Sequence, residues 1–372
     1  PVIPVILRPR SHDHLGAFWT ITQTHNIAGV SSQLLSHQPH SKMPRLNPLF
    51  LLSLTVALTA YMLSPTLRAF LTSVTTTLIP STSSQVTDSP KMKKPRMPVY
   101  FFSHGGPDVM YNKAHPVYPT LQHIGAEITS LAPTAILVFS AHWQSPSPTT
   151  ISINAAPGPA PLIYDFSGFP LHYYSATYPN TGSPQLASRV CSLLSASHGS
   201  NISCVPTTDR GLDHGVWAGF HVAFNPSANP LKVPLVQASL FRSEDPDAHY
   251  RLGAALSALR DEGVVIIGAG MSVHNLYHMS NDPRPMPYAV SFDDALKEAV
   301  EVSNVAERQD KMAQVCRRPD AKQAHPYMDH LMPIHVAAGA AGDDRGKQLW
   351  TMKEGSFAWA QYRFGDVPKS VT

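Results

Sequence analysis

Four short, uninterrupted apolar runs constrain the fold of this chain most strongly. They are Pro98–Ser103, Ala135–Ser140, Pro234–Ser239 and Gly263–Gly268. Each run is continuous rather than alternating, which is typical of strands that are covered on both faces. Helical patterns follow or separate them over residues 120–131, 184–197, 247–261 and 292–314. We therefore predict an α/β fold: a mostly parallel central sheet with helices on both faces.

Residues 1–96 differ in composition from the rest of the chain. No Asp or Glu occurs between His14 and Thr87, and residues 48–63 form an uncharged apolar segment. That segment is short for a membrane span and fits a membrane anchor or a signal peptide, whereas the acid-free leader also fits a transit peptide or a gene-model extension. We expect 1–96 to be a poorly ordered leader and linker, and 97–372 to be the globular domain, cytoplasmic by default.

Composition argues against a nucleic-acid partner and against a cysteine-based site, and it favours a metal site with nitrogen ligands. The net charge is +3 and the basic residues are scattered, so we expect no nucleic-acid partner. The three cysteines, Cys191, Cys204 and Cys316, are far apart in the sequence, and we interpret them as buried or free thiols rather than a disulfide framework or a zinc site. The 19 histidines make a nitrogen-ligated metal site plausible.

Three of the predicted strands lead into a histidine. His104 and His142 follow the first two runs, and His274 lies just beyond the last one. Ligands of open α/β sheets bind outside the carboxyl ends of the strands, so these side chains can converge on one point. A single histidine at such a position is usually a hydrogen-bonded structural residue. Three of them beside small residues favour a metal site at the carboxyl ends of the strands of this α/β fold.

Two further segments carry candidate residues. In AHPYMDHLMP, Pro326 suits a first helical turn, which would place His330 about one turn inside a helix. Asp329 could then contact the metal or support a ligand, although the segment could equally be a solvated helix start. His214 lies in a glycine-flanked turn, where it could polarise a substrate or cap the following helix.

Nine collinear segments resemble one known family. They are FFSHGGP, ILVFSAHWQS, YDFSGFP, YPNTGSPQLA, GLDHGVWAGF, PLVQASL, GAGMSVHN, AHPYMDHLMP and QYRFG. Between about residues 97 and 366 the chain resembles the class III extradiol ring-cleavage dioxygenase superfamily, in particular its 4,5-DOPA extradiol dioxygenase-like branch. The resemblance implies that residues 97–372 are the catalytic domain of a non-haem enzyme. Such an enzyme inserts both atoms of O2 into a small, DOPA-like aromatic diol and opens its ring.

The resemblance also implies roles for individual residues. His104, His142 and His330 match the metal ligands, with Fe(II) as the expected metal and Zn(II) as an occupant in isolated protein. His274 matches the acid/base and is near enough to be a fourth ligand, and His214 joins it as a second catalytic candidate. The implied substrate-pocket residues are His325, Trp143, Tyr164 and Phe169. The stretch GGPDVM and Val273 depart from the family pattern beside the pocket, so they bear on which catechol is used.

Two alternatives keep the same histidines. A zinc-dependent hydrolase would use them to hold a metal that activates water. A non-enzymatic metal-binding or scaffold relative would keep the fold without catalysing a reaction. The sequence leaves open the oligomeric state and the choice among DOPA, caffeate and protocatechuate-like catechols.

Overall fold

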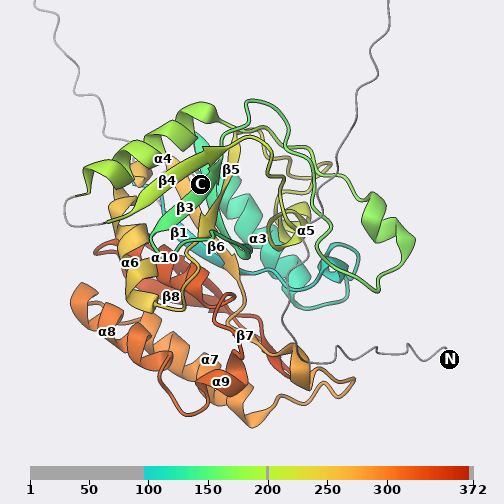
Figure 1. The fold of residues 1–372 in the computed structure, drawn as a ribbon. Helices are drawn as coiled ribbons and strands as arrows, with labels where there is room; N and C mark the ends of the chain where they lie inside the picture. Colours follow the sequence, from blue (N-terminus) through green and yellow to red (C-terminus); the bar gives the residue numbers. More distant parts are fainter. Residues whose placement is uncertain (1–95, 198–200, 368–372) are drawn as a thin grey trace, which may run out of the picture. The chain divides into compact units, whose positions relative to one another are not determined.

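The structure is a computed structural model that describes residues 96–197 and 201–367 (Figure 1). Its centre is an eight-stranded sheet in the order β4-β3-β5-β2-β6-β1-β11-β8. These strands are β1 (Val99–Ser103), β2 (Ala135–Gln144), β3 (Thr150–Asn154), β4 (Ser203–Thr207), β5 (Leu235–Leu240), β6 (Val264–Gly270), β8 (Gly346–Trp350) and β11 (Gln361–Phe364). A smaller sheet contains β7 (Val273–His274), β10 (Phe357–Ala358) and β9 (Lys353–Glu354).

The four strands predicted from the sequence form the parallel centre of the large sheet. Strands β5, β2, β6 and β1 pair in parallel, so their carboxyl ends meet at one edge. Antiparallel pairing occurs between β3 and β5, and where β11 joins β1 and β8. The prediction of a mostly parallel sheet is confirmed for this centre, and the antiparallel additions were not predicted.

Apolar side chains leave β1 toward both faces of the sheet. Val99 and Phe101 belong to one core, and Tyr100 and Phe102 belong to the other. The first core is covered by α4 (Pro184–Ala196), α6 (Pro246–Ala255), α7 (Pro287–Val300), α8 (Val305–Val315) and α10 (Met332–Ala341). The second is covered by α3 (Val117–Ser130) and α5 (His214–Ala223), which lie on the other side of the sheet in Figure 1. Helices therefore cover both faces, as continuous apolar strands require.

Short helices complete the described chain. They are η1 (Pro107–Met110), η2 (Leu171–Ser175), η3 (Ser257–Arg260), η4 (Leu276–His278) and α9 (Ala321–Ala324). The helix predicted over 247–261 is divided into α6 and η3. The long helix predicted over 292–314 is also two helices. The side chain of Asn304 accepts the Glu307 backbone N–H and begins α8 as an N-cap, so the chain turns there instead of continuing.

The helix predicted around His330 begins later than expected. Helix α9 ends at Ala324, and α10 begins at Met332, so His330 lies in the turn before α10 rather than inside a helix. Pro333, and not Pro326, occupies the first turn of that helix, where a missing N–H costs no hydrogen bond. The prediction of a helical His330 is therefore wrong.

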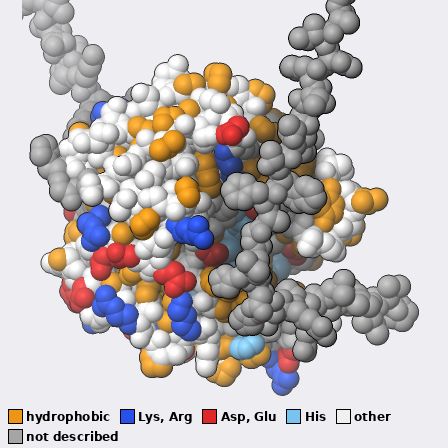
Figure 2. All heavy atoms as spheres, in the orientation of Figure 1, with side chains coloured by type: hydrophobic (Ala, Val, Ile, Leu, Met, Phe, Trp, Pro, Cys, Tyr) orange, Lys and Arg blue, Asp and Glu red, His pale blue; other side chains and the backbone are white. Residues whose placement is uncertain are grey.

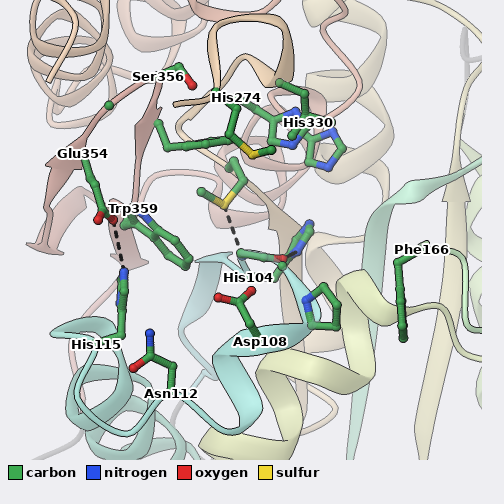
Figure 3. A pocket seen from close by; sticks show the side chains of 18 of the residues that line it. His104, Asp108, Asn112, His115, Phe166, His274, His330, Glu354, Ser356 and Trp359 are labelled. Atoms are coloured by element: carbon green, nitrogen blue, oxygen red, sulfur yellow. Dashed lines mark hydrogen bonds and ion pairs between the residues drawn. The ribbon is translucent and has the colours of Figure 1, made fainter. Parts of the chain in front are cut away.

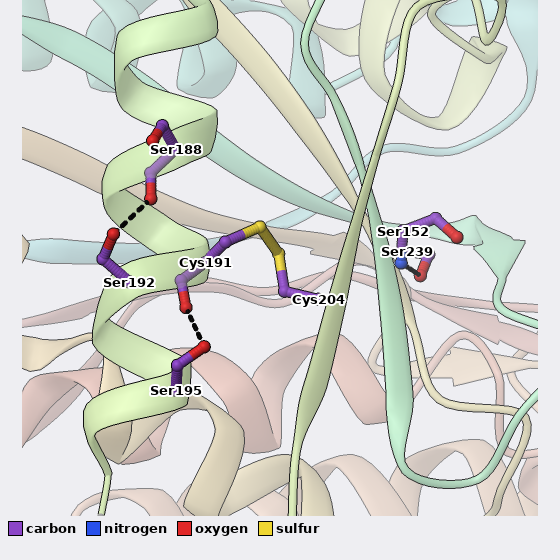
Figure 4. Close-up of a disulfide and its surroundings, with 7 residues drawn as sticks. All are labelled: Ser152, Ser188, Cys191, Ser192, Ser195, Cys204 and Ser239. Atoms are coloured by element: carbon purple, nitrogen blue, oxygen red, sulfur yellow. Dashed lines mark hydrogen bonds between the residues drawn. A yellow bond between two sulfur atoms is a disulfide. The ribbon is translucent and has the colours of Figure 1, made fainter.

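The interpretation of the cysteines is also corrected. Cys191 of α4 and Cys204 of β4 form a disulfide, with their Cα atoms 5.1 Å apart (Figure 4). It joins the edge strand of the sheet to the helix that packs beside it. Cys316 is a free, partly buried thiol, as predicted. A single bridge leaves no spacing pattern in a sequence, and only folding brings these two cysteines, 13 residues apart, together.

The predictions for the leader concern residues outside the described part of the chain, including the apolar segment 48–63. Within the described residues, no helix has the length and apolar character needed to cross a membrane. On the face shown in Figure 2, Lys and Arg side chains lie among Asp and Glu side chains rather than in one basic patch.

Candidate metal centre and substrate cavity

The carboxyl edge of the parallel strands brings the predicted histidines together. His104 directly follows β1, His142 is near the end of β2, and His274 follows β6 in the short strand β7. The backbone before α10 packs closely on this edge: a Cβ on Gly270 would come within 2.1 Å of the His330 carbonyl oxygen. That carbonyl accepts the Met271 N–H at 2.9 Å. A glycine at the end of β6 is therefore what allows His330 to reach the other histidines.

One ring nitrogen from each of His104, His142 and His330 lies within 4.8 Å of the other two. Nε2 of His142 is 3.2 Å from Nε2 of His330. Nε2 of His104 is buried and has no hydrogen-bond partner among the described residues. The structure thus places the three predicted ligands around one point.

The outer nitrogens of the same rings are all bonded to oxygen. Nδ1 of His104 is 2.7 Å from its neighbour's carbonyl oxygen, that of His142 is 2.9 Å from Asp165 and that of His330 is 3.0 Å from Asp329. Carbonyl and carboxylate oxygens only accept, so each Nδ1 carries the hydrogen and each Nε2 of a neutral ring holds a lone pair. Lone pairs that face one another without a donor between them fit a bound cation, and the oxygens are partners of the kind that orient metal-binding histidines.

Burial keeps two of these rings neutral. It lowers the pKa of His104 and of His330 well below the usual histidine value, and the neighbouring imidazoles lower it further. For His142, burial also opposes protonation, but the hydrogen bond to Asp165 and the nearby carboxylates raise its pKa. Burial works against the charge on Asp165 as well, yet its hydrogen bonds with His142 and His214 hold the pKa of that carboxyl well below its usual range.

His274 lies against the same group of rings. Its imidazole stacks on that of His330, with centroids 3.8 Å apart and planes within 9° (Figure 3). Burial, followed by the nearby histidines, lowers the pKa of His274 to about 3. A neutral imidazole beside the candidate metal ligands can accept a proton from a bound molecule.

These histidines line a cavity of about 700 Å³. Phe166, Met271 and Trp359 form apolar parts of its wall, and Figure 3 shows Phe166 and Trp359 on opposite sides of it. That volume is ample for a substituted single-ring aromatic compound. The cavity therefore offers an apolar space beside a cluster of nitrogen ligands.

The predicted pocket residues have different positions. His214 and Phe169 line the cavity. Tyr164 lies behind the wall, where its hydroxyl donates to the Ala176 carbonyl at 2.7 Å. The guanidinium of Arg210 lies over the Trp143 ring, 5.1 Å from its centroid.

His325 is fully buried, and its Nε2 is 2.9 Å from the Ser272 carbonyl oxygen. Its ring lies beside that of Phe292, with centroids 5.2 Å apart. This position supports the turn that leads to His274.

Two features of the site were not predicted. Asp165 contacts both His142 and His214, and its only sequence signal was its place inside the segment YDFSGFP. The second feature is a polar wall where His115 Nε2 lies 3.4 Å from Glu354, with the ring of Trp359 4.4 Å from that of His115. These residues are far apart in the sequence, so no spacing could have joined them.

Residues 98–365 match the family described as the catalytic LigB subunit of aromatic ring-opening dioxygenase. The chain belongs to that family. The match covers most of the described chain and includes all six histidines that line the cavity. The LigB membership makes the chain a ring-cleaving dioxygenase, and it confirms the superfamily predicted from the sequence.

Relatives of this LigB chain carry one recurring name. Proteins called "4,5-DOPA dioxygenase extradiol" are 37% identical in Beta vulgaris, over 71% of this chain and 95% of the relative, and 34% identical in Mirabilis jalapa, over 71% and 96%. The crystal structure of an uncharacterized protein from Escherichia coli K12 matches with a TM-score of 0.58 at 26% identity, covering 73% of this chain and all of that one. These relatives confirm the DOPA-like branch and the α/β fold.

Proposed function

We propose that this chain is a metal-dependent extradiol dioxygenase that cleaves a DOPA-like catechol, with Fe(II) held by His104, His142 and His330. The observation that carries the proposal is a set of three rings, two buried and that of His142 partly buried, whose inner nitrogens lie close together while each Nδ1 is bonded to oxygen. The choice of a DOPA-like substrate rests on the names of the relatives.

The protein residues hold and orient the reactants. When bound, Fe(II) supplies coordination positions for both catechol oxygens and for dioxygen, because three protein ligands leave part of its coordination sphere open. Neutral imidazole ligands bring no negative charge to the cation, which favours binding of a catecholate anion. The apolar wall formed by Phe166, Met271 and Trp359 holds the aromatic ring and excludes water.

His274 serves as the acid/base in this proposal. Its ring lies beside His330, it lines the cavity, and burial keeps it neutral at physiological pH. A ring nitrogen of His274 can therefore accept the proton of a catechol hydroxyl and return it later in the reaction. His214, which lines the same cavity, orients a second polar group of the substrate.

The direct test is oxygen consumption by the full chain loaded with Fe(II). With DOPA as substrate, we expect one O2 consumed per ring opened, together with a new visible absorption from the ring-fission product. His142→Ala serves as the matched loss-of-ligand control. Oxygen uptake that stays at background with every catechol tried, although iron is bound, contradicts the proposal. Turnover that continues without oxygen points instead to a hydrolase.

A further inference from the structure

Asp165 contacts two of the site histidines at once. Its Oδ2 lies 2.9 Å from Nδ1 of His142, and its Oδ1 lies 2.8 Å from Nδ1 of His214. Its Oδ1 also accepts the backbone N–H of His214 at 3.0 Å, at the first residue of α5. One carboxylate thus joins a strand, a helix and the segment of the cavity wall on which it lies.

These contacts fix where the hydrogens of both rings are. An ionised carboxylate has acceptors only, so Nδ1 of His142 and Nδ1 of His214 must both donate to it. Nε2 of each ring is then left with a lone pair. For His142 this is the nitrogen that lies 3.2 Å from Nε2 of His330. For His214 it becomes a hydrogen-bond acceptor in a ring that lines the cavity.

The position of Asp165 also ties the cavity wall to the metal site. The next residue, Phe166, lines the cavity and packs its ring against His214, with centroids 5.4 Å apart. The neighbouring carboxylate of Asp213 cannot replace Asp165, because it is fully buried and is bonded to Ser140 at 2.6 Å and to Arg210 at 3.1 Å. Asp165 is therefore the carboxylate available to both rings.

We propose that Asp165 is a positioning residue that fixes the tautomers of His142 and His214, and so sets the metal affinity of the site. The inference rests on the proposed function, because it requires a metal at His104, His142 and His330. Partners that orient metal-binding histidines typically contribute about 10- to 100-fold to metal affinity. Asn in place of Asp165 can accept from one ring only, so one of the two contacts becomes N–H facing N–H.

The experiment is titration of the metal-free full chain with Co(II), followed by the visible spectrum of the bound ion. We expect one site per chain in the native protein. Asp165→Asn should bind the ion about 10- to 100-fold more weakly and change its spectrum. Asp108→Asn is the matched control. Asp108 lines the same cavity, but no hydrogen bond or ion pair joins its carboxylate to a described histidine. Losing that charge should weaken binding by about fivefold or less.

A second variant separates positioning from folding. His214→Ala removes one partner of Asp165 and leaves its contact with His142, so Co(II) affinity should stay close to the native value. Thermal unfolding of each metal-free variant is measured alongside. If Asp165→Asn unfolds earlier but keeps native Co(II) affinity and spectrum, Asp165 is only structural and the inference is overturned.

Stoichiometry separates the remaining outcomes. His142, Asp165 and His214 could themselves surround an ion. Two ions per native chain and one per Asp165→Asn chain would make Asp165 a ligand, which also overturns the inference. Failure of the native chain to bind Co(II) would instead overturn the proposed function. One ion per native chain with unchanged affinity in Asp165→Asn overturns the positioning role alone.

Discussion

Buried histidines occur in two regions of this molecule, at the carboxyl edge of the sheet and in the helical core behind it. In the core, Nδ1 of His249 is 2.8 Å from the Asp245 carbonyl oxygen, and its Nε2 accepts the Phe241 N–H at 3.3 Å. Nε2 of His335 lies 3.5 Å from the sulfur of Cys316. Both rings are fully or almost fully buried. Protein atoms contact both nitrogens of His249 and Nε2 of His335.

At the sheet edge the same side chain is used differently. His104, His142 and His330 bind oxygens through Nδ1, but their Nε2 atoms point toward one another. Burial lowers the pKa of His249 to about 4 and of His335 to about 3, just as it lowers the pKa of His104 and His330. Burial and a lowered pKa are therefore common to both regions. Nε2 atoms that face one another distinguish the candidate metal site.

The strongest test of this difference replaces one histidine in each region by alanine. His104→Ala should lose bound iron and lower turnover by about a thousandfold or more, since the metal contributes several kcal/mol to the transition state. His249→Ala should keep its iron and instead lower the free energy of unfolding by about 1–3 kcal/mol, because it leaves backbone groups without partners. Elemental analysis measures the bound iron and oxygen uptake measures turnover. Urea unfolding measures the free energy of unfolding. Iron retained by His104→Ala would show that His104 is not a metal ligand and that the two regions do not differ in this way.

A second test divides the edge histidines by role. His274→Gln should keep its iron and lose about a hundredfold or more in kcat, as expected when a general acid/base is removed. Iron content and kcat are measured on the same sample. If iron content collapses while activity per bound iron stays native, His274 is a ligand and not the acid/base.

His325 tests whether a buried histidine near the site belongs to the core or contacts the substrate. It is bonded to the Ser272 carbonyl and packs beside Phe292, as a core residue does, although the sequence resemblance implies contact with substrate. We expect His325→Ala to lower unfolding stability by about 1–3 kcal/mol, because it leaves a buried carbonyl without its partner. Its KM for the catechol should remain near the native value. A large rise in KM with native stability would show instead that His325 contacts the substrate.

The last expected effect is a pH dependence of stability that arises from the core histidines. The unfolded chain takes up a proton on each histidine near pH 6.5, whereas the folded chain resists protonation of His249 down to about pH 4. Stability should therefore be full above about pH 6.5 and fall toward pH 4, by at most about 1.4 kcal/mol per pH unit for each such histidine. His249→Gln should reduce this slope. His123→Gln, at an exposed position of α3, should not change it.

The sequence predicted those parts of the molecule in which local pattern and burial agree. Strands β1, β2, β5 and β6 are covered on both faces, so their apolar runs are continuous and visible. His104 and His142 could then be placed at strand ends by topology alone. Strand β4, SCVPT, was not predicted, because it is an edge strand with partly exposed side chains and an internal proline.

Other features required contacts that the sequence does not record. Asp165 reaches His142 and His214 only after the cavity segment folds onto the sheet edge. The disulfide of Cys191 and Cys204 likewise depends on β4 lying beside α4. The break between α7 and α8 did carry a signal, since Asn304 followed three residues later by Glu307 is typical of a helix start.

In the proposed enzyme, imidazoles from distant parts of the chain share one ion. The most direct measurement is anomalous diffraction from crystals of the full chain loaded with Fe(II) or Co(II). We predict a single strong peak, which places the ion about 2.1 Å from Nε2 of His104, His142 and His330, the distance typical of metal–imidazole bonds. A peak at another position, or none at these nitrogens in protein that binds the ion stoichiometrically, would contradict the account.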